Sequence, residues 1–187
     1  MYGLYLSNKC LFDKKTIIIK TNMSPKGREL PAEFFERMTV WLKSARVPYR
    51  VIEHASIDGT ASGSSATSGT RSEQGAKALI MMVGGEKPIM VVVRGPDRVD
   101  YKAVKRITKS QNVRLAKLEE IGKVTPLAIG TLPPFGDLFG ITTYVDQQLL
   151  DQQEIACGTG LATRTLMIRT DDFRKVARPL IGNFAKQ

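Results

Sequence analysis

Lys77 is the first residue of the chain whose type and position could serve carbonyl chemistry. It is a single charge near the start of an otherwise apolar run, residues 76–83. Its ammonium could face a polar pocket, where it would polarise a carbonyl or hold a phosphate or hydroxyl. Alternatively, its aliphatic stem could lie along apolar surface and carry the charge out to solvent. The residues alone leave both readings open.

A second candidate is the glycine- and proline-rich segment at residues 130–136, which runs from Gly130 through Pro134 and Phe135 to Gly136. Glycine lets other groups approach the backbone closely, and proline stiffens a turn. Such a loop can direct backbone N–H groups at a developing oxyanion. Because prolines have no N–H, the flanking residues must supply the donors. The alternative is a plain surface turn, although the apolar side chain of Phe135 indicates packing.

Other catalytic residues are sparse. His54 is the sole histidine, and a lone histidine after a strand-like run is more typical of a structural residue than of a base. Cys10 and Cys157 lie far apart, so no Cys/His zinc set can be assembled, and we expect no metal or cofactor. The chain has no G-x-S-x-G, P-loop or G-x-G-x-x-G pattern. A covalent mechanism therefore has no visible machinery.

Charge and composition limit the partners. The chain has 187 residues and a net charge of +10, with 28 Lys and Arg against 18 Asp and Glu. This surplus favours a polyanionic partner such as RNA, with a well-solvated basic protein as the alternative. Two distant cysteines indicate a reducing, cytoplasmic compartment. No apolar run reaches the ~20 residues of a membrane span, so we expect no membrane partner.

Hydrophobic spacing predicts a mixed α/β (α+β) domain. Trp41 lies on the apolar face of the first predicted helix and is expected in the core. The glycine pair 84–85 between two apolar runs predicts a hairpin. Thr170 is the expected N-cap of the last helix. The predicted helices are 32–45, 101–108, 117–121 and 171–177, and the predicted strands are 49–53, 76–83, 88–93, 139–145, 155–157 and 165–168.

The domain is expected at residues 32–183, preceded by a flexible extension at 1–31. An edge strand within that extension is the alternative, and Met23 is a second candidate start. Residues 56–75 are rich in Ser, Thr and Gly and could be an interdomain linker or a loop with a short helix lining a pocket. Too few residues precede them for an independent domain, which favours the loop.

Together these segments resemble the YbaK/prolyl-tRNA-synthetase-associated aminoacyl-tRNA editing family (ProX-like). The matching segments follow the family's order over roughly residues 34–180. They are Glu53-His54, Thr60, residues 73–79, 100–108 and 118–122, the 130–136 loop, a strand ending at Asp146, the Gly158 and Gly160 pair, and residues 165–168 and 171–173. The resemblance implies a curved, barrel-like mixed sheet with surrounding helices.

The resemblance also implies a function: hydrolysis of the ester that joins a wrong amino acid to tRNA, typically tRNA(Pro) carrying alanine, cysteine or another small amino acid. Prolyl-tRNA synthetase or a multi-synthetase assembly would be a partner. A catalytically idle tRNA- or synthetase-binding module is the alternative, and a hydrolase with another substrate is a third.

Residue roles follow from the same resemblance. Lys77 matches the functional lysine, and Gly130 with Pro134 matches the glycine loop that positions the substrate carbonyl and terminal adenosine. Substrate-binding positions are then expected at His54, Thr60, Pro134, Phe135, Gly136, Asp146 and Gly158.

The chain departs from the family pattern in two places. Residues 122–126 also fit glycine-x-x-x-proline, so the loop assignment is not unique. Residues 156–160 replace the histidine–proline pair of the alanine-specific branch, so alanine specificity by that route is not predicted.

Overall fold

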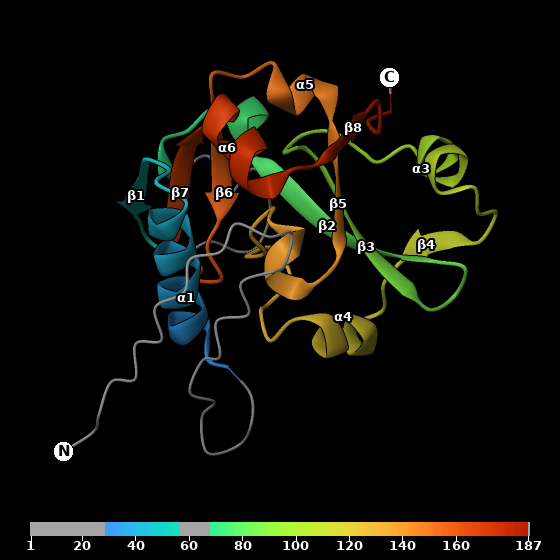
Figure 1. Ribbon diagram of the computed structural model, residues 1–187, viewed down its shortest axis with the longest axis horizontal. Helices are drawn as coiled ribbons and strands as arrows, with labels where there is room; N and C mark the ends of the chain where they lie inside the picture. The colour runs from blue at the N-terminus through green and yellow to red at the C-terminus, as the bar shows by residue number, and fades with distance from the viewer. Residues whose placement is uncertain (1–28, 57–67, 187) are drawn as a thin grey trace, which may run out of the picture.

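Two β-sheets form the centre of the molecule (Figure 1). The computed structural model describes residues 29–56 and 68–186. The smaller sheet is antiparallel, with β7 between β1 and β6, and the larger has the order β4-β2-β3-β5-β8. Their bounds are β1 Tyr49–Glu53, β2 Ala76–Val83, β3 Lys87–Arg94, β4 Val113–Leu115, β5 Thr142–Asp146, β6 Glu154–Gly158, β7 Arg164–Arg169 and β8 Leu180–Gly182.

The larger sheet is mixed. β2 pairs antiparallel with β3 and β4, whereas β5 lies parallel to both β3 and β8. A parallel bridge between Gly75 and Ala156 joins the beginning of β2 to β6 and thus links the two sheets. The predicted mixed α+β fold is confirmed, with two sheets meeting at this bridge rather than one closed barrel.

Helices cover both sheets (Figure 1). They are α1 Pro31–Ser44, α3 Tyr101–Thr108, α4 Leu118–Val124, α5 Gln147–Leu150 and α6 Thr170–Ala177. Phe34 of α1 and Phe173 of α6 are fully buried and belong to one core cluster with Leu166 of β7. None of the helices in the described residues is long and apolar enough to span a bilayer.

Side-chain alternation along β2 and β3 divides the core in two. Ile80 and Val92 face the cluster that contains α1 and α6, whereas Met81 and Val91 face a second cluster with Val104 of α3. Successive side chains on a strand point to opposite faces, so the hairpin contributes to both clusters. This burial on both faces explains why the two runs are almost continuously apolar.

Most predicted elements are confirmed to within a few residues, and helix 101–108 and strands 49–53 and 76–83 have the expected bounds. Two details were wrong. Arg169, not Thr170, is the N-cap of α6, because the Thr170 hydroxyl donates to the Gln152 carbonyl instead. The strand expected at 139–145 begins only at Thr142, since residues up to Phe139 form a 3₁₀ turn that ends at Gly140 with φ of 68°.

Candidate active site

The 130–136 loop is an internal structural segment. Residues 131–136 are all buried, which excludes a plain surface turn, and Gly130 stays exposed with φ of 86°. The competing glycine-x-x-x-proline segment begins at Gly122 inside helix α4, so only the second copy forms a loop. Phe135 is fully buried between Trp41 and Phe173, with ring centroids 5.3 and 5.6 Å away. This aromatic contact anchors the loop to α1 and α6.

Backbone hydrogen bonds fix the shape of the loop. The Thr131 N–H donates to the Ala128 carbonyl at 3.2 Å, and the Gly136 N–H donates to Thr143 Oγ1 at 2.9 Å. A side chain at Gly136 would collide with the Ile141 carbonyl and Thr143 Oγ1. Pro133 and Pro134 carry no N–H, and the other residues at 131–136 are buried, so Gly130 is the residue of the loop with an N–H in an exposed position.

Gly158, at the end of β6, lies directly against this loop. A Cβ added there would be 2.6 Å from the carbonyl oxygens of both Thr131 and Leu132. The Gly160 N–H donates to the Thr131 carbonyl at 2.8 Å and ties the loop to the segment after β6. Glycine is thus required at 158 by the close approach of another backbone segment.

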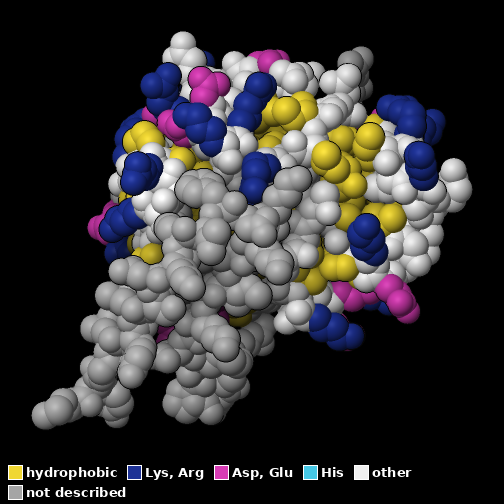
Figure 2. Space-filling view, viewed as in Figure 1, with side chains coloured by type: hydrophobic (Ala, Val, Ile, Leu, Met, Phe, Trp, Pro, Cys, Tyr) yellow, Lys and Arg dark blue, Asp and Glu magenta, His cyan; other side chains and the backbone are white. Residues whose placement is uncertain are grey.

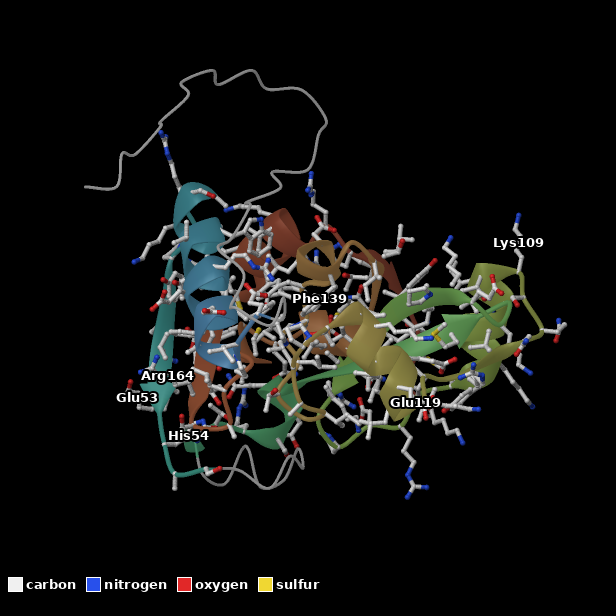
Figure 3. All side chains as sticks on the ribbon, turned by 90° about the horizontal axis from the view of Figure 1, so that it is seen from below. Glu53, His54, Lys109, Glu119, Phe139 and Arg164 are labelled. Atoms are coloured by element: carbon white, nitrogen blue, oxygen red, sulfur yellow. The ribbon has the colours of Figure 1, made fainter. Side chains whose placement is uncertain are left out.

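His54 follows β1 and reaches the same region. Its Nε2 lies 2.9 Å from Thr165 Oγ1, and its Nδ1 lies 2.8 Å from the Ala55 carbonyl. A carbonyl can only accept, so Nδ1 carries the proton and Nε2 accepts from the threonine hydroxyl. Figure 3 shows His54 at the end of β1, beside Glu53 and Arg164, which form an ion pair at 2.9 Å. Both ring nitrogens are occupied, as a structural role for His54 requires.

Lys77 is half-buried near the start of β2. Its ammonium donates to the carbonyls of Gly95 and Asp97, in the turn that follows β3. An ion pair between Arg94 and Asp97, 2.7 Å long, braces this turn. Burial lowers the pKa of Lys77, the Asp97 charge raises it and the Arg98 charge lowers it. An ammonium has three N–H donors, so one remains for a ligand after the two carbonyls are satisfied.

A strand pair and a backbone bridge relate these residues to one another. Gly158 pairs with Thr165 across β6 and β7, and paired residues share a face. The loop backbone contacts Gly158, and His54 bonds Thr165, so His54, Gly158 and the loop form one contiguous region. The bridge between Gly75 and Ala156 places the start of β2 beside β6, two residues before Gly158. Lys77 lies two residues beyond Gly75, on the face of β2 that packs against the second core cluster, and its ammonium bonds the turn after β3.

Other expected site residues are placed differently. Asp146 is 1% exposed, and its Oδ2 accepts from the backbone N–H groups of Phe184 and Ala185 at 2.6 and 2.8 Å. Its Oδ1 accepts from the Gln148 N–H at 2.9 Å, which caps α5. Asp146 therefore holds the C-terminal segment in place, and its predicted contact with substrate stays a prediction. Thr60 lies outside the described residues.

Sequence reasoning did not identify the hydroxyl groups that organise this region. Thr143 receives the Gly136 N–H, and Thr165 bonds His54. The signal that could have found Thr165 is its position opposite Gly158 in the adjacent strand, and that pairing depends on a strand register that the sequence does not give. Cys157 is buried, and burial raises the pKa of its thiol, so it is no nucleophile. The described residues hold no group of three His, Cys, Asp or Glu side chains suited to a metal ion.

Comparison with known proteins identifies the fold and family. Residues 59–176 match the family described as the aminoacyl-tRNA editing domain. This is well over half of the chain. The protein belongs to the aminoacyl-tRNA editing domain family. The predicted family is thus confirmed, and with it the prediction of an ester-hydrolysing editing enzyme.

Two relatives make the comparison concrete. The Escherichia coli (strain K12) multifunctional Ser/Thr-tRNA deacylase ProXp-y is 24% identical over 155 residues, covering 81% of this chain and 92% of that protein. A crystal structure described as a candidate trans-editing enzyme for prolyl tRNA synthetase superposes with a TM-score of 0.72 at 20% identity. That superposition covers 89% of this chain and all of the other chain, and it supports the fold.

Proposed function

We propose that this editing domain hydrolyses the ester between a small amino acid and the terminal ribose of a mischarged tRNA, with Lys77 and the 130–136 loop as its catalytic groups. The observation that carries the proposal is the bridge between Gly75 and Ala156, which places the start of β2, with Lys77, beside the strand whose Gly158 contacts the loop. The family match makes an aminoacyl ester the natural substrate class.

Polarisation and positioning are the proposed sources of catalysis. The remaining N–H of Lys77 donates to the ester carbonyl oxygen and stabilises the negative charge that develops as water attacks. Water's oxygen forms the new bond to the carbonyl carbon, the ester C–O bond breaks, and the ribose hydroxyl leaves with a proton. The exposed Gly130 end of the loop admits the terminal adenosine, and its rigid backbone holds the ester in place.

His54 is not the base in this proposal. Its Nε2 already accepts from Thr165, and its Nδ1 proton is held by the Ala55 carbonyl. The ribose hydroxyl next to the ester is a substrate group able to assist the attacking water. His54 instead fixes the end of β1 against β7, behind Gly158.

Two substrate sets are compatible with the relatives. The ProXp-y relative is named for serine and threonine esters, and the structural neighbour for prolyl-tRNA synthetase. The substrate panel therefore contains serine and threonine esters beside alanine and cysteine esters, both on tRNA(Pro) and on the cognate tRNA of each amino acid. Discrimination by a single methylene is worth only ~1–3 kcal/mol, so graded rates are expected across this panel.

The test is a deacylation panel with the full chain, Lys77→Ala and a matched control, Lys87→Ala. Lys87 is an exposed lysine at the start of β3 in the same hairpin. Loss of one charge-stabilising donor typically lowers kcat ~10²–10³-fold, so we expect that loss for Lys77→Ala and none for Lys87→Ala. Undiminished turnover by Lys77→Ala would remove the lysine from the mechanism. Wild-type protein that binds tRNA without hydrolysing any ester would instead identify an idle binding module.

A further inference from the structure

A polar cleft of about 610 Å³ lies at the end of β6 opposite to Gly158. The cleft is lined by residues of three segments: the turn before β6 and the first residue of β6, the last residue of β7, and the first turns of α6. Among them are Gln152, Glu154, Arg169 and Arg174. Figure 2 shows Lys and Arg side chains gathered over the part of the surface that includes α6. None of these residues belongs to the proposed catalytic region.

Two guanidinium groups in this cleft are available to a ligand. The ion pairs within the described residues include neither Arg169 nor Arg174, and both side chains are exposed. The Glu154 carboxylate is already occupied by Arg50, at 2.7 Å. Arg71 adds a further positive charge from the segment before β2, where it donates to the Gln152 side chain at 3.4 Å.

Arginines both line and border the cleft. Its lining holds Arg169 and Arg174 beside the carboxylates of Glu154 and Asp171. At its border Arg50 pairs with Glu154, and Arg71 bonds the Gln152 side chain. Guanidinium groups suit phosphate oxygens because their planar N–H donors can bind two oxygens at once. A polar, open cleft with two arginines outside the ion pairs of the described residues is suited to a sugar-phosphate backbone, whose contacts position a nucleic acid without reading its sequence.

We propose that this arginine cleft binds the phosphates just upstream of the 3′ end of the tRNA, an inference that rests on the proposed function. β6 links the two regions, since Glu154 lines the cleft and Gly158 contacts the catalytic loop. Four residue steps of a strand span ~13 Å. Stacked nucleotides rise ~3.4 Å each, so this length matches about four nucleotides of a single-stranded 3′ end. An ester at Gly158 would then place upstream phosphates at Arg169 and Arg174.

The test measures binding of uncharged tRNA, which does not depend on hydrolysis. The variant is Arg169→Ala/Arg174→Ala, and the charge-matched control is Arg106→Ala/Lys109→Ala. Arg106 and Lys109 are exposed at the end of α3, and Figure 3 shows Lys109 far from His54. Each phosphate contact contributes ~0.7 to the slope of log K against log salt concentration for a single strand, so the cleft variant should lose ~1.4 of slope. The control should keep the wild-type slope.

Deacylation by the same proteins completes the test. The cleft variant should show a raised KM with kcat within about twofold of wild type, because the reacting ester is held elsewhere. Arg169→Lys/Arg174→Lys keeps both charges and should keep most of the slope, and thermal unfolding checks that every variant is folded. Equal slopes in the cleft variant and wild type would overturn the proposal, as would equal losses in the cleft variant and the control. Wild-type protein that binds tRNA through the cleft but hydrolyses no ester would leave the cleft standing and refute the proposed function.

Discussion

Gly158→Ala tests whether the contact between β6 and the 130–136 loop matters for catalysis. The added methyl carbon would start 2.6 Å from two backbone carbonyl oxygens, those of Thr131 and Leu132, whereas ordinary contact begins at 3.4 Å. The loop must therefore move by about 0.8 Å. The φ of Gly158 lies outside the left-handed region, so alanine itself fits the strand and the effect is purely steric.

The expected magnitude follows from that displacement. A misplacement of ~1 Å at a catalytic group can cost ~10²-fold in rate, which corresponds to ~2.7 kcal/mol of transition-state stabilisation. Overpacking should also lower the free energy of unfolding by ~1–3 kcal/mol. We expect kcat for deacylation to fall ~10²-fold, measured under single-turnover conditions at a temperature where the variant is fully folded.

Gly84→Ala is the matched control for this experiment. Gly84 lies in the turn between β2 and β3 with φ of 64°, and a Cβ there meets nothing within 4 Å. Alanine in that left-handed conformation costs ~1–2 kcal/mol of stability without touching the loop. The control should lose stability and keep kcat. If Gly158→Ala keeps the wild-type kcat while its stability falls like that of the control, the loop contact is structural only and our reasoning about catalysis fails.

Two further predictions concern buried charge. Burial lowers the pKa of Lys77, so the rate of deacylation should decline at alkaline pH with a midpoint below 10.5. The rate is corrected for uncatalysed hydrolysis, and the residual rate of Lys77→Ala should not show this alkaline decline. Between the lowered pKa of Lys77 in the folded state and 10.5, the unfolded state binds more protons than the folded state. The contribution of Lys77 to the free energy of unfolding should therefore rise with pH in that window. A difference in the free energy of unfolding between wild type and Lys77→Met that stays constant with pH would contradict this. Asp146→Ala leaves three backbone N–H groups without their carboxylate and should lower the free energy of unfolding by ~3 kcal/mol in urea denaturation, with kcat of the folded fraction unchanged. A large loss of kcat without loss of stability would instead support the predicted contact of Asp146 with substrate.

Local pattern predicted the regular elements because their signals lie within a few residues. Strand β2 and helix α3 were found with their bounds, since periodicity and flanking turns are local features. Short elements held by distant partners were missed. β8 has three residues and exists because it pairs with β5, and the tail after it is fixed by the Asp146 carboxylate.

The candidate site could be predicted as a set of residues but not as an arrangement. Lys77 and the loop were identified from residue type and from family resemblance, while their spatial relation depends on the bridge between Gly75 and Ala156, residues 81 positions apart. The requirement for glycine at 158 arises from two carbonyls of a segment some 27 positions earlier. The sequence alone offers no signal for either approach, since neither involves periodicity or a strained φ at these positions.

β6 connects the chemistry to the proposed RNA contacts. It bridges the two sheets at Ala156, contacts the 130–136 loop at Gly158 and borders the arginine cleft at Glu154. β6 is paired along its length with β7, so the distance between cleft and loop is fixed by the backbone geometry of the strand. Binding energy gained by the arginines at one end therefore adds to the affinity for a substrate whose ester is held at the other, and binding that is equal in the ground state and the transition state lowers KM without raising kcat. A substrate shortened to the terminal aminoacyl-adenosine should therefore show a raised KM with kcat little changed, and the cleft variant should treat the short substrate as wild type does.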